Sequence, residues 1–172
     1  AYTALFDAVV SEIRSVADPN HRLKFQGLAL VGHGERKTWW TEFLTHQNHI
    51  ASTVDAINSA SFHFYTLPQH RTDNSTWSYT MFETVDVFRD EVRRIVALRD
   101  KLSPNTELSV DELGVLLPHD NQIWAAIPSD LYFNGANGVF TYVYAMLSEY
   151  GIDVAGCSQL AGMPVIPEWQ IY

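Results

Sequence analysis

The alternation of helical and strand-like segments constrains the fold of this chain more than any other feature. Segments in which apolar residues recur every three or four positions, typical of amphipathic helices, alternate with short apolar runs, typical of buried strands. Strands that alternate with helices predict βαβ units and a parallel sheet in an α/β fold. The helical segments are 2–17, 35–49, 79–102 and 138–151, and the strand-like runs are 23–32, 56–65, 106–115 and 153–162.

Helix-stopping residues and apolar faces support this division of the chain. "DPN" closes the first helix, "SPN" follows the helix over 79–102, and Gly151 ends the last helix in the C′ position. The expected packing faces are Leu5, Val9, Ile13 and Val16 on the first helix, and Trp39, Trp40, Phe43 and Leu44 on the second.

Length, charge and hydropathy exclude several classes of protein. The 172 residues are 47% hydrophobic, which suits a single domain with a substantial core. The net charge of −9 gives an acidic surface that repels phosphate backbones, so we expect no nucleic-acid binding. No apolar run approaches the roughly 20 residues that span a bilayer, so we expect no membrane insertion. The chain opens in helical periodicity without an initiator Met, and we expect it to be a processed or excised segment.

No sequence pattern predicts a metal or a cofactor. The single cysteine, Cys157, excludes an internal disulfide framework and a thiolate zinc site. The seven histidines lack the H-x-x-x-H and H-E-x-x-H spacings of metal sites. "GHGE" after the first strand lacks the glycine patterns that bind nucleotide phosphates.

The third strand, "ELSVDELGV", ends in acids and supplies the main functional candidate. Strict alternation of side chains puts Glu112 on the face of Leu108 and Val110, and Asp111 on the opposite face. In a parallel α/β barrel, catalytic groups lie at the carboxyl ends of the strands. Glu112 is therefore a candidate catalytic carboxylate, and the alternative is a strand-end Glu that pairs with a nearby base. We expect Asp111 to face the helix layer or to cap the turn, and Glu107 to serve stability.

The preceding strand, "SFHFY", offers partners for this carboxylate. His63 and Tyr65 share one face of that strand, and Phe62 and Phe64 share the other. Adjacent strands lie about 4.8 Å apart, so His63 and Tyr65 are expected to line one pocket with Glu112. A histidine or tyrosine beside a carboxylate holds it ionised and aimed. The alternative is a structural histidine at a strand end.

At "LKFQGLALVG", "SFHFY" and "VDELGV" the chain resembles glycoside hydrolases built on a (β/α)8 barrel, and most of all family 39-like proteins, the β-xylosidases and α-L-iduronidases. The resemblance extends through "WWTEFLTHQNH" and "GVFTYVYAMLSEYGIDVAGCSQLAG". It implies an α/β, partial (β/α)8 TIM barrel that runs from about helix 4 to strand 8. Residues 1–172 would form the C-terminal half of one catalytic domain, since a complete barrel needs about 250 residues.

The resemblance also implies a mechanism, which is retaining hydrolysis of β-linked glycosides. The family's nucleophile is a Glu at the end of strand seven, which corresponds to Glu112. Its acid/base is a Glu that follows an Asn at the end of strand four, which would precede Ala1. The acid/base would therefore come from an N-terminal half-barrel segment or chain. Glu35 is the nearest substitute, but it begins a helix, where an acid favours the helix dipole.

The remaining predictions concern sugar binding and modification. The predicted substrate-binding residues, for an oligosaccharide or glycoside, are His63, Tyr65, Trp124, Gln159, Trp169 and His33. The two tryptophans lie in loops after strands seven and eight, where they either stack on sugar rings or anchor the loops. "NST" makes Asn74 a glycosylation site in a polar loop, which favours a secreted protein. The alternative function is a catalytically inactive glycosidase-like module that binds carbohydrate or builds an extracellular assembly.

Overall fold

The computed structural model describes residues 1–31, 37–70, 72–118 and 130–158, and these form alternating helices and parallel strands. The predicted α/β class and the order of the elements are confirmed. The helices are α1 (Tyr2–Val16), α2 (Lys37–Leu44), α3 (Trp77–Leu102) and α4 (Asp130–Glu149). The strands are β1 (Gln26–Val31), β2 (Ser59–Thr66), β3 (Glu107–Val115) and β4 (Val154–Cys157). Short 3₁₀ turns cover His46–Asn48, Val54–Ala56 and Asn74–Thr76.

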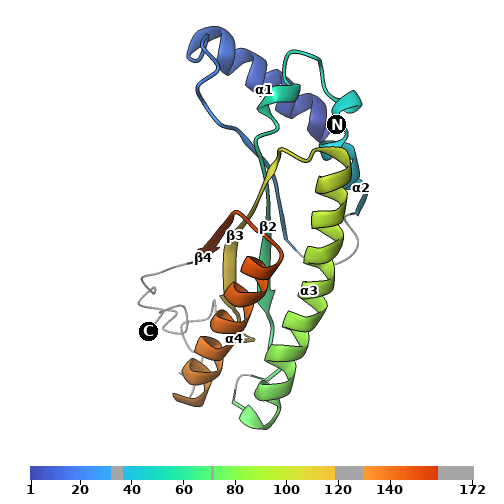
Figure 1. The fold of residues 1–172 in the computed structure, drawn as a ribbon. Helices are drawn as coiled ribbons and strands as arrows, with labels where there is room; N and C mark the ends of the chain where they lie inside the picture. The colour runs from blue at the N-terminus through green and yellow to red at the C-terminus, as the bar shows by residue number, and fades with distance from the viewer. Residues whose placement is uncertain (32–36, 71, 119–129, 159–172) are drawn as a thin grey trace.

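The four strands form one parallel sheet in the order β1-β2-β3-β4, so that spatial order follows chain order. Figure 1 shows α2, α3 and α4 along one side of this sheet, whereas α1 lies beyond the ends at which β2 and β3 begin. Each crossover between neighbouring strands therefore passes through the same helix layer, as in consecutive units of a βα barrel. Within the described residues, none of the helices combines the length and apolarity that a membrane crossing requires.

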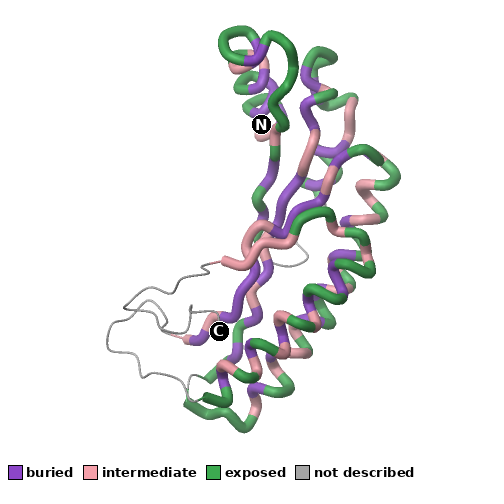
Figure 2. Tube along the Cα trace, turned by 60° about the vertical axis from the view of Figure 1, so that its left-hand side comes forward, coloured by how far each residue is buried: buried purple, intermediate pink, exposed green. Residues whose placement is uncertain are grey.

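The core lies between the sheet and the helix layer, where aromatic rings from both interlock. Phe88 of α3 stacks on Phe64 with ring centroids 4.1 Å apart, and it also contacts Phe62. Trp40 of α2 meets Phe62 edge to face at 5.5 Å. Figure 2 shows this buried layer following the strands and the inner sides of the helices. The helix-facing residues of the sheet are thus fixed by packing, which leaves the polar residues of the strands on the other face.

The structure corrects the start of α4, which begins at Asp130 rather than at residue 138. Two glycines of this helix lie before residue 139, and glycine forms helix poorly. Inside α4, however, a Cβ on Gly135 would lie 3.3 Å from Met81 Sδ, and one on Gly138 would lie 3.2 Å from Phe82 Cζ. These glycines therefore allow α4 to approach α3 closely, which offsets their weak helix propensity.

The packing face of α1 also differs from the prediction. Leu5, Val9 and Val16 are 62%, 48% and 74% exposed. The buried face instead combines apolar and charged side chains, namely Thr3, Phe6, Asp7, Val10 and Arg14. Asp7 and Arg14 make buried or part-buried hydrogen bonds to the segment after α2, and these bonds select the face that turns inward. Trp39 of α2 is likewise exposed, although its neighbours Trp40, Phe43 and Leu44 are buried as expected.

A β-bulge in β3 overturns the predicted alternation of the acids. Phe62 pairs with Val110, but the next residue of β2, His63, pairs with Glu112, so Asp111 is an extra residue in β3. An extra residue reverses the alternation beyond it. Leu113 therefore joins Val110 in the core, and Glu112 lies on the opposite side of the strand from both.

Candidate active site

The site lies on what we call the polar face, defined by Ser59, Ser61, His63 and Tyr65 of β2 and by Glu107, Ser109, Asp111 and Glu112 of β3. Register places His63 directly beside Glu112 and Tyr65 beside Gly114. The four residues of β2 alternate regularly with Phe62 and Phe64, which point into the core. This part of the sequence prediction is confirmed: His63 and Tyr65 share a face, and both reach Glu112.

His63 lies between two carboxylates. Its Nδ1 is 3.3 Å from Oε2 of Glu112, and its Nε2 is 3.3 Å from Oδ1 of Asp111. The side chains of His63, Asp111 and Glu112 are 15%, 31% and 46% exposed. The prediction that Asp111 points away from the site is therefore wrong. Val110 faces the helices, so alternation puts Asp111 on the polar face, and the bulge turns Glu112 to that face as well.

Tyr65 holds the carboxylate of Glu112 through a direct hydrogen bond. Its hydroxyl donates to Oε2 of Glu112 at 2.8 Å, and a second hydrogen bond of 3.0 Å joins Tyr65 Oη to Ser158 Oγ. Burial raises the pKa of Tyr65 to about 12; the bond to Ser158 opposes this rise, and the Glu112 carboxylate adds to it. The phenol is therefore a neutral donor throughout the physiological range.

Gly114 makes room for the ring of Tyr65, and sequence reasoning missed its role. A Cβ at this position would lie only 2.7 Å from Cε1 of Tyr65. The Tyr65 ring thus crosses the backbone of β3 at the residue with which it is paired, and its hydroxyl reaches Glu112 two residues earlier. The glycine in "VDELGV" is the signal that was available, since a glycine inside a strand often marks close approach.

A residue of β1, Gln26, also holds the side chain of Asp111 in place. The side-chain amide of Gln26 donates to Oδ2 of Asp111 at 3.1 Å. Oδ1 of Asp111 is buried and has no hydrogen bond of good geometry within the described part of the chain, although His63 lies at ion-pair distance. The hydroxyl of Ser61 on the same face is also buried without a hydrogen-bond partner there. Such buried polar atoms are uncommon and call for a functional or structural reason.

The other predicted residues separate into two groups. His33, Trp124, Gln159 and Trp169, as well as Glu35, lie outside the described residues. Asn74 is exposed at the start of the 3₁₀ turn before α3, where the side chain of Asp73 accepts a hydrogen bond from the backbone of Ser75.

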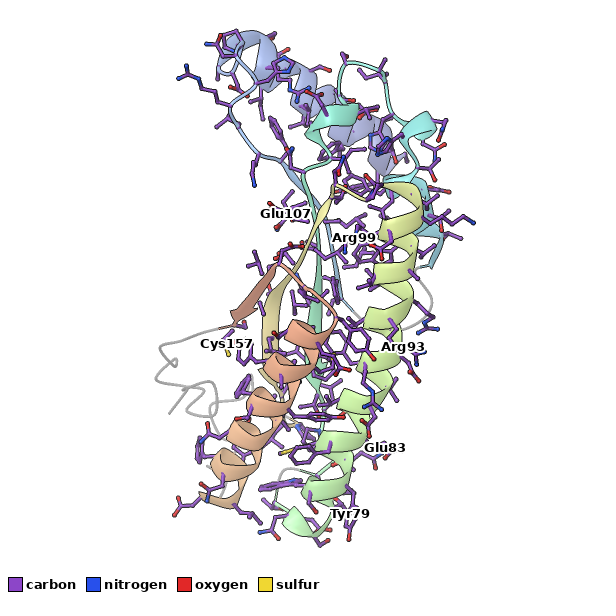
Figure 3. The ribbon with its side chains drawn as sticks, in the orientation of Figure 1. Tyr79, Glu83, Arg93, Arg99, Glu107 and Cys157 are labelled. Atoms are coloured by element: carbon purple, nitrogen blue, oxygen red, sulfur yellow. The ribbon has the colours of Figure 1, made fainter. Side chains whose placement is uncertain are left out.

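Glu107 is the first residue of β3, and Figure 3 shows it at the end of the strand nearest α1, whereas Asp111 and Glu112 lie further along the strand. It forms an exposed ion pair with Lys24 at 2.7 Å. Exposed pairs of this kind contribute about 0–1 kcal/mol, so Glu107 is a useful reference for the acids of the site. Over residues 1–31, 37–70, 72–118 and 130–158, no group of three or more His, Cys, Asp or Glu side chains is arranged to hold a metal ion.

Comparisons with known proteins give a fold but no family. No family model matches the sequence, and no curated protein does either. Among solved structures, a family GH51 arabinofuranosidase from Xanthomonas axonopodis pv. citri matches 92% of this chain and 33% of its own, with 19% identity and a TM-score of 0.63. A Paenibacillus polymyxa xyloglucanase from glycoside hydrolase family 44 matches 94% of this chain and 37% of its own, with 16% identity and a TM-score of 0.61.

A third structure, an endo-1,4-β-D-mannanase from Thermotoga petrophila RKU-1, matches 90% of this chain and 39% of its own, with 14% identity and a TM-score of 0.51. The chain thus spans about a third of the length of the first two structures. It has the α/β fold of a partial TIM barrel of the kind found in these glycoside hydrolases. At such low identity the likeness extends to the fold alone.

Proposed function

We propose that this chain carries the nucleophile of a retaining glycoside hydrolase that acts on β-linked glycosides, and that Glu112 is that nucleophile. The observation that carries the proposal is the hydrogen bond of 2.8 Å from Tyr65 to Glu112, in the C-terminal half of β3 and on the polar face of a barrel-type sheet. Carboxyl ends of barrel strands are where catalytic groups of this fold are placed.

The chemistry needs an ionised carboxylate with one oxygen free to attack. The contacts from Tyr65 and His63 both use Oε2 of Glu112, which leaves Oε1 as the attacking oxygen. Oε1 forms a bond to the anomeric carbon as the bond to the leaving oxygen breaks, and an acid gives that oxygen its proton. Water then attacks the glycosyl ester, gives its proton to the same group, and releases the sugar and the Glu112 carboxylate.

The acid/base belongs, in this proposal, to an N-terminal half-barrel supplied by another segment or chain, with residues 1–172 as the C-terminal half. In retaining enzymes the two carboxyl groups lie about 5–5.5 Å apart. Two observations support a completing half. The chain spans about a third of the glycoside hydrolases that it matches in fold. In addition, the apolar stripe of Leu5, Val9 and Val16 on α1 is exposed, whereas such helix faces are normally buried.

The proposal also includes a family and a location. We assign the protein to the group of family 39-like glycoside hydrolases, and we expect it to be secreted. "SFHFY" and "VDELG" carry the family assignment, and the three solved structures that share the fold come from other groups of glycosidases. The exposed sequon at Asn74 supports a secreted glycoprotein. The substrate-binding roles of His33, Trp124, Gln159 and Trp169 remain part of the same proposal.

The test is turnover of a panel of aryl β-glycosides by the protein in its native assembled form. Glu112→Gln keeps the shape of the side chain but removes its charge, so we expect loss of activity by about 10⁴-fold or more. Glu107→Gln makes the same change on the same strand, away from the site, and is expected to retain wild-type activity. Wild-type turnover by Glu112→Gln would refute the assignment. An unmodified protein that binds oligosaccharides but hydrolyses no glycoside would favour the inactive binding module.

A further inference from the structure

We infer that Asp111 is a positioning residue that holds the ring of His63 as an imidazolium against Glu112. The polar face would then carry a row of carboxylate, imidazolium and carboxylate, with the histidine in the middle. The catalytic meaning of this row rests on the proposed function, but the charge arrangement itself does not.

The first argument is the chemistry of the ring. A neutral imidazole has one N–H group and one lone pair, whereas an imidazolium has two N–H groups. Both ring nitrogens of His63 lie 3.3 Å from carboxylate oxygens, Nδ1 from Glu112 and Nε2 from Asp111. Both contacts are ion-pair distances rather than aligned hydrogen bonds, so charge decides which form of the ring is favoured. A positive ring between two ionised carboxylates is favoured over a neutral ring in the same place.

The second argument is that Asp111 is held in place for this contact. Regular alternation after the buried Val110 puts Asp111 on the polar face with Ser109, and the bulge turns Glu112 to the same face. The side-chain amide of Gln26 donates a hydrogen bond of 3.1 Å to Oδ2 of Asp111, and the other oxygen, Oδ1, lies 3.3 Å from Nε2 of His63. Because Oδ1 is buried and has no hydrogen bond elsewhere among the described residues, a charged ring beside it reduces the cost of its burial.

The third argument is the charge balance around His63. The ionisable groups that face it within the described chain are Asp111 and Glu112 from β3 and Tyr65 from its own strand, while Gln26 from β1 is neutral. Two negative charges and a neutral phenol favour a positive ring that is itself only 15% exposed. No cation among these groups opposes that charge.

This arrangement has a consequence for the proposed reaction. While Glu112 is a free carboxylate, the imidazolium keeps it ionised and oriented. When Glu112 becomes a glycosyl ester it loses its charge, and Asp111 remains as the counter-ion of His63. The ring therefore need not gain or lose a proton during the cycle, and its geometry is the same in both half-reactions.

The test is two-bond ¹H–¹⁵N NMR of the histidine rings at pH 7.5, with the His63 signals assigned from His63→Gln. We expect both ring nitrogens of His63 to show imidazolium shifts in the unmodified protein. In Asp111→Asn we expect one protonated and one unprotonated nitrogen. Asp90→Asn removes an exposed acid of α3 that pairs with Arg93, and it should leave the His63 signals unchanged. The acid limb of the kcat/KM profile should move to higher pH in Asp111→Asn but not in Asp90→Asn.

A neutral His63 ring in the unmodified protein would overturn the inference, and this measurement does not depend on whether any variant folds. An imidazolium that persists in Asp111→Asn would also overturn it. The NMR readout needs no substrate, so it is independent of the proposed function. An imidazolium in a protein whose Glu112→Gln variant is fully active would refute the nucleophile but not the charged row. A neutral ring in a protein that requires Glu112 would do the reverse.

Discussion

Two histidines of this molecule face carboxylates, and their surroundings differ sharply. His49 packs under α1 with Nδ1 2.7 Å from Oδ1 of Asp7 and Nε2 2.7 Å from the carbonyl oxygen of Phe43. Its side chain is 0% exposed and that of Asp7 is 6% exposed. On the polar face, His63 keeps 3.3 Å from both Asp111 and Glu112, and Glu112 is nearly half exposed.

The difference lies in how fully the acceptors are used. Oδ1 of Asp7 accepts from His49 and Thr53, and Oδ2 accepts from the backbone N–H of Ile50. Phe6 and Phe43 enclose the ring of His49 edge-on. A saturated and enclosed pair of this kind secures α1 against the segment after α2. The contacts of Glu112 with the other described residues, in contrast, use one oxygen only, which suits a group that must still react with a ligand.

The largest effect is expected from breaking the enclosed pair. Asp7→Asn removes a buried carboxylate that accepts hydrogen bonds from His49, Thr53 and Ile50, so we expect the free energy of unfolding to fall by about 3 kcal/mol. The measurement is urea unfolding at pH 7. Glu107→Gln breaks an exposed pair with Lys24 and should cost less than about 1 kcal/mol. Equal losses in the two variants would show that the enclosed pair has no special structural role.

A smaller effect is expected from removing the hydrogen bond between Tyr65 and Glu112 on the polar face. Tyr65→Phe removes the hydrogen bond to Glu112, and a bond to a charged group is worth about 1.5–3 kcal/mol. We expect kcat/KM for aryl β-glycosides to fall by roughly 10- to 100-fold, and the free energy of unfolding to fall by less than it does in Asp7→Asn. Tyr142→Phe removes a comparable bond from a tyrosine to Asp86 between α3 and α4, and it should leave turnover unchanged. If both variants lose activity alike, the role of Tyr65 is not local to Glu112.

The two regions are also expected to respond to opposite ends of the pH scale. Burial alone would raise the pKa of Asp7, but hydrogen bonds from His49, Thr53 and Ile50 outweigh it, and the pKa is lowered. The stability that Asp7 contributes is therefore full above the unfolded pKa of about 3.9 and is lost as the pH falls below it. The pKa of Tyr65 is raised, so its effect on stability has the opposite pH dependence. The stability that Tyr65 contributes is full below pH 10.0 and declines as the pH rises toward about 12.

This expectation is tested by unfolding free energies measured across the pH range. The difference between the unmodified protein and Asp7→Asn should shrink as the pH falls from about 5 to 2. The difference between the unmodified protein and Tyr65→Phe should change only above pH 10. If the difference for Asp7→Asn grows in acid instead, folding raises the pKa of Asp7 rather than lowering it.

Much of the architecture could be predicted from the sequence because it depends on local periodicity. Alternating helical and strand-like segments indicated the parallel sheet, and the alternation of His63 and Tyr65 with Phe62 and Phe64 indicated one face of the site correctly. Along β2 no residue is inserted on that stretch, so a period of two holds.

The rest depends on contacts that periodicity does not record. The bulge at Asp111 is a property of the pairing between β2 and β3, and a single inserted residue reversed the faces assigned to Glu112 and Leu113. Similarly, the apolar stripe on α1 suggested one packing face, but the bonds of Asp7 and Arg14 to residues more than thirty positions away selected another. In both places a polar side chain with a distant partner decided the local structure.

Whether Glu112 attacks a sugar carbon can be decided by trapping the covalent intermediate. The native assembled protein would be incubated with 2,4-dinitrophenyl 2-deoxy-2-fluoro-β-glycosides, whose leaving group departs without the help of an acid. Peptide mass spectrometry should then find one fluoroglycosyl ester, on Glu112, and none in Glu112→Gln. An ester on any other residue, or none while the unmodified protein still hydrolyses aryl β-glycosides, would show that Glu112 is not the nucleophile.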